Sequence, residues 1–331
     1  MTVPVSIVIP VHNGRELLAK LLASILRQTA TPAEIIVVDN GSTDGAAQVA
    51  REAGARVIDL GRNTGFAAAV NRGIREAVSP GIALVNSDVE LDERWLEVLW
   101  AGAGSSTCQF ATGKILQTGT QDILDGSFDL LCRGGTAWRA GAGSAASASF
   151  DSFRAIQFCS ATAAIFRSDL FSRVGLFEES FESYLEDVDL GLRCAAAGLQ
   201  GGYFPDAVCW HRGSATFGRW DTRVVRLISR NQVFLIARHY PGQLILHWLW
   251  PIVVAQALWG VLAVRHGCTI AYLRGKVEGL CRFAAQRSAS TQAANLEPIL
   301  TESELQIRRL QSQIGFDAYW KVYFRLPGVS K

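Results

Sequence analysis

The run Asn86-Ser87-Asp88-Val89-Glu90 places oxygen-bearing side chains directly after a short apolar segment. Hard divalent cations such as Mg²⁺ and Mn²⁺ take oxygen ligands and are shared with substrate phosphates. Asp88 is therefore a candidate ligand for such a cation, and Glu90 is a weaker one. The alternative is that these residues only form a turn at the end of a strand.

A second acidic cluster, Glu186-Asp187-Val188-Asp189, follows the aromatic residues Phe177, Phe181 and Tyr184. A carboxylate beside a hydrophobic wall has a raised proton affinity and can serve as a general base. The alternative is a solvated helix start, where acidic side chains interact favourably with the helix dipole.

Two further features could contact a nucleotide. The turn Asp39-Asn40-Gly41-Ser42-Thr43-Asp44 places Asp39 to accept a hydrogen bond from a base N–H or a ribose hydroxyl, unless it only caps the next helix. His211 follows the apolar residues Val208-Cys209-Trp210 and could bind a metal or a phosphate, although a lone histidine can equally be structural.

The elements that must position these residues alternate along the chain. Apolar runs and helical spacing predict strands at 5–11, 35–38, 56–60 and 82–85, and helices at 15–28, 46–53, 66–78 and 187–197. This alternation predicts a mostly parallel sheet, in which ligands bind beyond the carboxyl ends of the strands. His12, Asp39 and Asp88 follow three of those ends. Residues 134–149, rich in Gly, Ala and Ser, are expected to form a mobile loop.

Charge is divided unevenly along the 331 residues. Residues 1–218 hold 17 Lys and Arg against 24 Asp and Glu, a net charge of −7, whereas residues 219–331 hold 15 against 6, a net charge of +9. The basic part predicts an anionic partner, either nucleic acid or a lipid headgroup. Seven cysteines without a CxxC pair argue against a disulfide framework or a zinc ribbon and favour a reducing, cytoplasmic compartment. No signal peptide is predicted.

The motifs together resemble glycosyltransferase family 2, and within it the rhamnosyltransferase-like enzymes that build bacterial cell-surface glycans. The resemblance covers roughly residues 3–240. It rests on the order and spacing of seven stretches, with His211 downstream: 5–13, 37–45, 63–67, 71–73, 84–89, 175–179 and 184–193.

This resemblance implies an α/β architecture known as the GT-A fold, a Rossmann-like, mostly parallel sheet flanked by helices. Residues 1–100 would form the nucleotide-sugar-binding half and residues 101–218 the acceptor-binding half. Residues 219–331 would form a basic, apolar helical region that associates with a membrane. The resemblance also implies an inverting transfer from a nucleotide-diphospho-sugar that depends on Mg²⁺ or Mn²⁺.

Carried over residue by residue, the resemblance implies a role for each motif position. Donor-binding residues would be Pro10, His12 and Asp39 around the base and ribose, Asn63 and Asn71 near the ribose and diphosphate, and Asp88 at the cation. Asp187 would be the general base, and His211 would lie near the metal and diphosphate. The leading acid of the family's metal motif is Asn86 here, so one carboxylate is missing.

The apolar stretch 244–264 is long enough for a bilayer span, but its composition favours another arrangement. Pro251 would break a helix midway, basic residues lie on both sides, and Trp248, Trp250 and Trp259 are typical of the headgroup interface. We expect helices that lie in or dip into the cytoplasmic leaflet, the alternative being a buried hairpin. Nucleic acid is not an expected partner, because the basic residues form no recognisable binding motif.

The sequence thus predicts a peripheral or monotopic glycosyltransferase at the cytoplasmic face of the inner (cell) membrane, acting in O-antigen or cell-wall polysaccharide synthesis. The favoured donor is dTDP-L-rhamnose and the expected acceptor is a lipid-linked glycan. UDP-hexose and UDP-galactofuranose are alternative donors, and a non-catalytic nucleotide-sugar-binding scaffold is the alternative from another class. Heptad-like spacing at 299–314 predicts a helix that packs on the core or joins two subunits in a homodimer.

Overall fold

The computed structural model describes residues 1–105, 108–120, 122–213, 220–288 and 295–327. Strands and helices alternate in its first part: β1 (Thr2–Val11), α1 (Arg15–Leu26), β2 (Thr31–Asp39), α2 (Ala46–Glu52), β3 (Arg56–Asp59), α3 (Phe66–Glu76) and β4 (Gly81–Val85). The four strands and three helices predicted for this part are confirmed.

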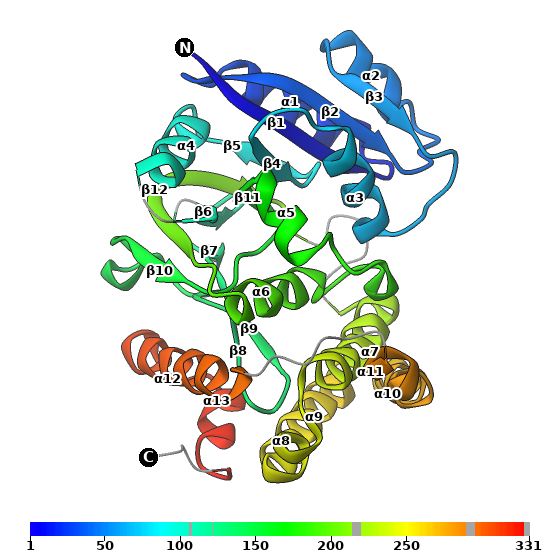
Figure 1. The fold of residues 1–331 in the computed structure, drawn as a ribbon, viewed down its shortest axis with the longest axis vertical. Helices are drawn as coiled ribbons and strands as arrows, with labels where there is room; N and C mark the ends of the chain where they lie inside the picture. The colour runs from blue at the N-terminus through cyan, green and yellow to red at the C-terminus, as the bar shows by residue number, and fades with distance from the viewer. Residues whose placement is uncertain (106–107, 121, 214–219, 289–294, 328–331) are drawn as a thin grey trace.

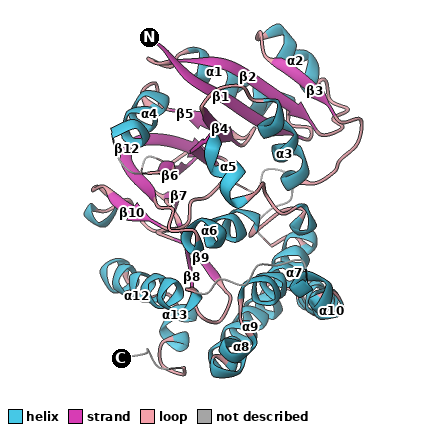
Figure 2. Ribbon diagram, viewed as in Figure 1, coloured by secondary structure: helices cyan, strands magenta, loops and turns pink. Residues whose placement is uncertain are grey.

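Ten strands of the described residues form one sheet, which is parallel in its first half and mixed in its second. β1 pairs in parallel with β2 and β4, and β2 pairs in parallel with β3. The later strands are β5 (Val89–Leu91), β6 (Phe110–Gln117), β7 (Leu124–Gly126), β10 (Arg154–Ile156), β11 (Ala163–Arg167) and β12 (Gly201–His211). β11 lies antiparallel between β4 and β6, and β12 runs parallel to β6. Figure 2 shows these strands in the upper part of the molecule with helices around them.

Both faces of β1 are buried, which explains its unbroken apolar sequence. Ile7 and Ile9 point into the cluster that also contains the apolar residues of α1, whereas Val8 points to the opposite cluster, with Val70 of α3. Gly73 lets α3 approach the sheet closely, because a Cβ at this position would lie 2.2 Å from the Val8 side chain.

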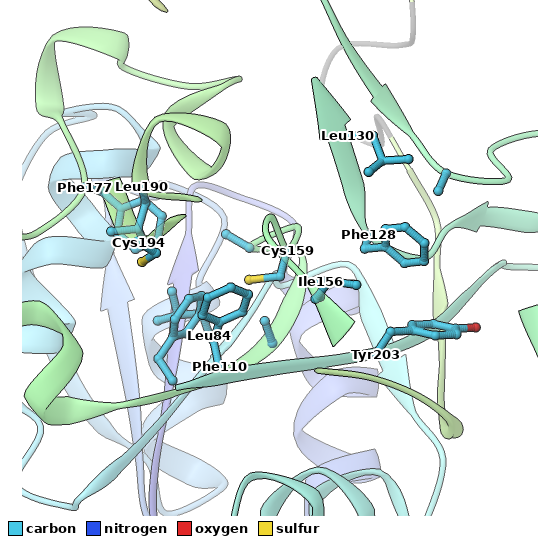
Figure 3. Packing of buried hydrophobic residues seen from close by; sticks show 14 of the residues in the cluster. Leu84, Phe110, Phe128, Leu130, Ile156, Cys159, Phe177, Leu190, Cys194 and Tyr203 are labelled. Carbon is cyan, nitrogen blue, oxygen red and sulfur yellow. The ribbon is translucent and has the colours of Figure 1, made fainter. Parts of the chain in front are cut away.

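The α6 helix (Glu186–Ala196), predicted at 187–197, is held against the sheet by apolar contacts. Leu190 and Cys194 of α6 belong to the same buried cluster as Leu84 of β4 and Phe110 of β6 (Figure 3). All seven cysteines are free, as the sequence predicts, and six of them are buried. The remaining elements of this part are α4 (Trp95–Ser105), α5 (Ser168–Val174) and the 3₁₀ turns at Ala148–Phe150 and Glu179–Phe181.

The loop expected at 134–149 is interrupted by a strand. β9 (Ala137–Arg139) lies within this segment and pairs with β8 (Asp129–Leu131), which precedes it, whereas residues 140–147 form turns and irregular structure. Gly134 lies so close to a later helix that a Cβ would meet the Ala255 side chain at 2.3 Å. The small residues of this segment therefore serve close packing, at least at Gly134.

The C-terminal part is helical, as expected, and Figure 1 shows it at the end of the molecule away from β1 to β3. Its helices are α7 (Thr222–His239), α8 (Gly242–His247), α9 (Leu249–Arg265), α10 (Thr269–Cys281), α11 (Phe283–Ser288), α12 (Leu296–Ile314) and α13 (Ala318–Tyr323). The apolar stretch 244–264 is not one helix, as expected: it is divided between α8 and α9 at Trp248. Pro251 follows this break and lies in the first turn of α9, where a missing N–H costs little. Among the helices of the described ranges, none combines the length and hydropathy needed to cross a membrane.

The heptad-like positions of α12 lie in the core of this chain. Leu300, Ile307 and Leu310 are fully buried, and Glu304 forms a buried ion pair with Arg133 at 2.8 Å. Packing on the core is therefore the arrangement that the structure adopts for this helix. The expected boundary at 218/219 lies in the segment 214–219, outside the described residues.

Candidate active site

His12 and Asp39 lie at the carboxyl ends of adjacent parallel strands. Val11 of β1 is in register with Asp39 of β2, so His12 projects just beyond the strand end. The Asp39 carboxylate accepts a hydrogen bond from the Ser42 N–H at 2.9 Å and thereby holds the turn that follows β2. Pro10 is buried within β1. This strand edge is where the sequence predicts the base and ribose.

Asn63 joins this edge through Asn40. The Asn40 amide donates to Asn63 Oδ1 at 3.3 Å, and its oxygen accepts from the Thr64 N–H at 2.7 Å. Asn63 itself is exposed, so it remains accessible to a ligand.

Asn71 does not face the donor edge, contrary to expectation. Its side chain is 1% exposed and donates to the Phe177 carbonyl at 2.8 Å and to Glu179 Oε1 at 3.0 Å. Its oxygen accepts from the Phe177 N–H at 3.0 Å. Because these contacts engage both of its polar atoms, Asn71 instead ties α3 to the segment that precedes α6.

Asp88 and His211 meet at the tip of β4, as the sequence predicts for the metal side. β5 pairs antiparallel with β12, with Val89 opposite His211, and this pairing brings Asp88 Oδ1 within 3.2 Å of His211 Nε2. The other ring nitrogen of His211 lies 2.8 Å from Asp125 Oδ2. Burial lowers the pKa of His211, but hydrogen bonds to Asp125 and Asp88 raise it to about 9.

These donors fit a divalent cation that a substrate shares. Asp88 Oδ1 and His211 Nε2 lie in direct contact at 3.2 Å, and Oδ1 of Asn86, two residues before Asp88, is buried without a hydrogen-bond partner. A cation bound by His211 would take the place of the ring proton that Asp88 accepts. Nowhere in the described ranges do three or more His, Cys, Asp or Glu side chains form a group that could hold a metal ion. A small number of protein ligands is the pattern expected of Mg²⁺ or Mn²⁺ completed by diphosphate oxygens.

The three acids at the start of α6 have different environments. Asp189 is fully buried, bonded to Arg193 and His239 at 2.8 Å each, and these partners lower its pKa despite burial. Glu186 is 6% exposed with one carboxyl oxygen unpaired, and burial raises its pKa well above the usual range. Asp187 is more accessible and accepts backbone N–H bonds from Ala161 at 3.3 Å and Val188 at 2.9 Å. Burial also raises the pKa of Asp187, and a raised proton affinity on the most accessible of the three acids suits a general base.

Asp88 and Asp187 come to the same edge of the sheet because β4 and β11 are neighbours. Past the end of β4, the Asn86 N–H donates to the Thr162 carbonyl at 2.9 Å. The preceding residue, Ala161, donates its N–H to Asp187. The metal side and the base side are thus joined through one short segment.

Arg139, Asp125 and Asp129 also belong to the site, although the sequence analysis did not identify them. Arg139 on β9 lies 3.6 Å from Asp125 and 3.5 Å from Asp129, its partner across the β8–β9 hairpin. Because Asp125 also contacts His211, these residues connect the two acidic motifs. Acidic residues within an otherwise apolar segment, at 125 and 129, were the available signal.

Two cavities adjoin the acidic motifs. Asp88 lines one of about 140 Å³ together with the cations Lys20 and Arg212. Asp187 lines a smaller one of about 10 Å³ beside Cys159 and Cys194. Glu90 also lines the larger cavity, so its two cations face two carboxylates, a lining that suits an anionic group bound together with a cation.

Comparison with protein-family models gives two matches. The model described as Glycosyl transferase family 2 matches residues 6–175, and the model described as Glycosyl transferase family group 2 matches residues 136–274.

Individual proteins are also similar to the chain, in sequence or in fold. The N-acetylglucosaminyl-diphospho-decaprenol L-rhamnosyltransferase of Mycobacterium tuberculosis is 27% identical over 278 residues, covering 75% of this chain and 87% of that protein. A structure of GalNAc-T7 with UDP, GalNAc and Mn²⁺ matches 94% of this chain and 58% of its own, with 13% identity and a TM-score of 0.61. The mannosyltransferase PcManGT from Pyrobaculum calidifontis, with GDP-Man and Mn²⁺, matches 97% of this chain and 85% of its own, with 17% identity and a TM-score of 0.52. These structural matches support the GT-A fold.

Proposed function

We propose that this chain moves L-rhamnose from dTDP-L-rhamnose to a lipid-linked glycan with inversion. It belongs to glycosyltransferase family 2 and transfers a sugar from a nucleotide sugar. The similarity to a decaprenol-linked rhamnosyltransferase supports this choice of donor and acceptor class. The product would enter cell-surface polysaccharide synthesis.

The observation that carries the proposal is the placement of Asp88 and Asp187 at one sheet edge, joined by the Asn86–Thr162 and Ala161–Asp187 hydrogen bonds. Transfer to a hydroxyl group needs a base on the acceptor side and charge stabilisation on the phosphate side. Asp187 takes the acceptor proton on one side of this segment, while Asp88 belongs to the phosphate side.

Asp88 and His211 would hold the divalent cation, and Asn86 precedes Asp88 by two residues. When bound, Mg²⁺ or Mn²⁺ supplies positive charge against the departing nucleoside diphosphate. Lys20 and Arg212, which line the cavity beside Asp88, add fixed positive charge at the same place.

The base assignment is tested by Asp187→Asn, which keeps the size of the side chain and removes its basicity. Turnover should fall by about 10²- to 10⁴-fold while donor binding persists. Asp169→Asn is the matched control, because Asp169 also lies in the first turn of a helix, α5, but is exposed. Near-normal turnover of Asp187→Asn would contradict the base assignment.

The donor is tested by thermal shift with dTDP-L-rhamnose, UDP-hexoses and UDP-galactofuranose, each with and without Mn²⁺. A ligand that binds only the folded state raises the melting temperature, so the preferred donor should give the largest shift, and only with the cation. Asp88→Asn should lose the cation-dependent part. A larger shift with a UDP-sugar would exclude the rhamnose donor, and a donor that binds without any turnover would favour the non-catalytic scaffold.

We further propose that α9 and α10 bind the cytoplasmic face of the inner membrane. Exposed apolar residues recur at helical spacing on both, forming what we call the apolar face: Trp250, Val253, Val261 and Val264 on α9, and Ile270, Leu273, Val277 and Leu280 on α10. These side chains are 48–73% exposed. The exposed cations Arg265, Arg274 and Arg282 lie within or beside the same helices. An apolar face with adjacent cations is the pattern of a helix in an anionic lipid interface.

Vesicle cosedimentation tests this surface. Leu273→Glu and Val277→Glu should each reduce binding to vesicles that contain phosphatidylglycerol. Leu26→Glu is the control, because Leu26 is 67% exposed on the distant helix α1. Equal binding by all three variants would contradict the membrane proposal, and a change from dimer to monomer instead would assign the apolar face to a second copy of the chain.

A further inference from the structure

Arg139 lies at the centre of the polar network between the two acidic motifs. Its guanidinium donates to Ser160 Oγ at 2.6 Å and to Thr162 Oγ1 at 3.4 Å, and it lies 3.5 Å from Asp129. Ser160 and Thr162 flank Ala161, whose N–H donates to Asp187. Arg139 therefore holds the backbone segment that positions the Asp187 carboxylate.

The charges around Asp187 come from four elements. Glu186 precedes it on α6, Asp129 faces it from β8, Arg139 from β9 and Cys159 from the segment before β11. Burial raises the pKa of Cys159 well above its usual range, so this thiol is neutral. Arg139 is thus the cation among these four groups, and it carries its charge at all relevant pH values.

An ionised base in this setting needs a counter-charge. Burial raises the pKa of Asp187 above its usual range, and Arg139 and the backbone N–H bonds offset only part of that rise. Burial also raises the pKa of Asp129 to about 7, with Asp187 adding to the effect and Arg139 opposing it. Without Arg139, the pKa of Asp187 would rise further, and Asp187 would stay protonated up to a higher pH.

We propose that Arg139 is a positioning residue for the transfer reaction, which holds the Ser160–Thr162 segment and keeps Asp187 ionised so that Asp187 accepts the proton of the acceptor hydroxyl. This inference rests on the proposed function, in which Asp187 is the base. The Arg139 side chain is 31% exposed, so its guanidinium lies at the edge of the site and remains partly hydrated.

The test is the pH dependence of kcat/KM at saturating Mn²⁺ for Arg139→Met and Arg139→Lys. Removing a neighbouring cation should raise the apparent pKa of the acid limb by about one unit or more. At a pH below the acid limbs of both enzymes, kcat/KM of Arg139→Met should therefore be about tenfold lower than that of the wild type. Arg139→Lys keeps the charge and should move the limb less. Arg154→Met is the control, because Arg154 lies on β10 and bonds the Ser149 carbonyl at 3.2 Å, away from Asp187.

A change of opposite sign keeps the proposal testable if Arg139→Met does not fold. Asp129→Asn removes the carboxylate that competes for Arg139, so the acid limb should move to lower pH. The proposal would be overturned if folded Arg139→Met kept the acid limb of its kcat/KM profile at the wild-type pH. It would also be overturned if the acid limb of Asp129→Asn moved to higher pH. Neither result would affect the base assignment, which fails only if Asp187→Asn retains turnover.

Discussion

The segment that leads into Asp187 has an unusual backbone, and Asn231 of α7 holds it. Glu182, Tyr184 and Leu185 have φ values of 60°, 70° and 68°, a left-handed conformation that costs non-glycine residues of order 1–3 kcal/mol each. Asn231 is fully buried beside this segment. Strain of this size persists only where surrounding contacts offset it.

The Asn231 amide supplies those contacts. Its Nδ2 donates to the backbone carbonyls of Phe181, Ser183 and Tyr184 at 2.9, 2.9 and 2.7 Å. Asn231→Asp keeps the size of the side chain and removes the amide donors. The Ser183 and Tyr184 carbonyls then lose this partner, whereas the Phe181 carbonyl keeps the Arg230 guanidinium at 2.8 Å. Since a lost partner in a buried site costs about 1–3 kcal/mol, the free energy of unfolding should fall by at least ~2 kcal/mol.

Urea unfolding and steady-state kinetics measure the two consequences of Asn231→Asp. The urea midpoint should fall, and kcat should fall more than the donor KM rises, because the segment positions Asp187, whereas His12 follows β1 and Asp39 ends β2. Asn295→Asp is the control, since Asn295 is exposed and its side chain makes no capping bond to α12.

Two results would refute this reasoning. If Asn231→Asp unfolded at the wild-type urea concentration, the three hydrogen bonds would not stabilise the fold. If the variant were destabilised but kept its kcat, the left-handed segment would be irrelevant to the position of Asp187.

Three further predictions follow from other buried groups. Burial lowers the pKa of Lys276 to about 7 in the folded chain, whereas in the unfolded chain this side chain stays charged up to about pH 10. The free energy of unfolding should therefore rise between pH 7 and 10 more for the wild type than for Lys276→Met, which urea midpoints would measure. Glu304→Leu leaves Arg133 buried without its ion-pair partner and should lose about 3–5 kcal/mol, and Arg133→Met/Glu304→Leu should recover most of it; equal urea midpoints for the single and double variants would contradict this. Gly73→Val should unfold at lower temperature than wild type, because even a Cβ would overlap Val8; an unchanged melting temperature would contradict the close packing of α3.

The first half of the fold follows from local patterns in the sequence. β-branched runs with both faces buried predict β1, β2 and β4, and the spacing of leucines predicts α1, because side-chain direction repeats every two residues in a strand and every 3.6 in a helix. Polar residues at the strand ends then predict the positions of His12, Asp39 and Asp88, since parallel strands end at one edge.

The order of the motifs along the chain also predicted that Asp88 and His211 lie on the same side of the site. It also named Asp187 as the base through the resemblance, but it gave no reason why the neighbouring acid Asp189 differs. Asp189 is bound by His239 of α7, a helix far away in sequence, whereas Asp187 is bound by Ala161.

The amino-acid sequence by itself determined the alternating elements, the strand-end motifs and the family. Only the tertiary structure decided which polar groups face one another. Arg139 reaches Asp187 through a hairpin of three-residue strands, and Asn71 turns inward to the Phe177 backbone. Such contacts depend on the register between distant segments, and no local periodicity encodes that register.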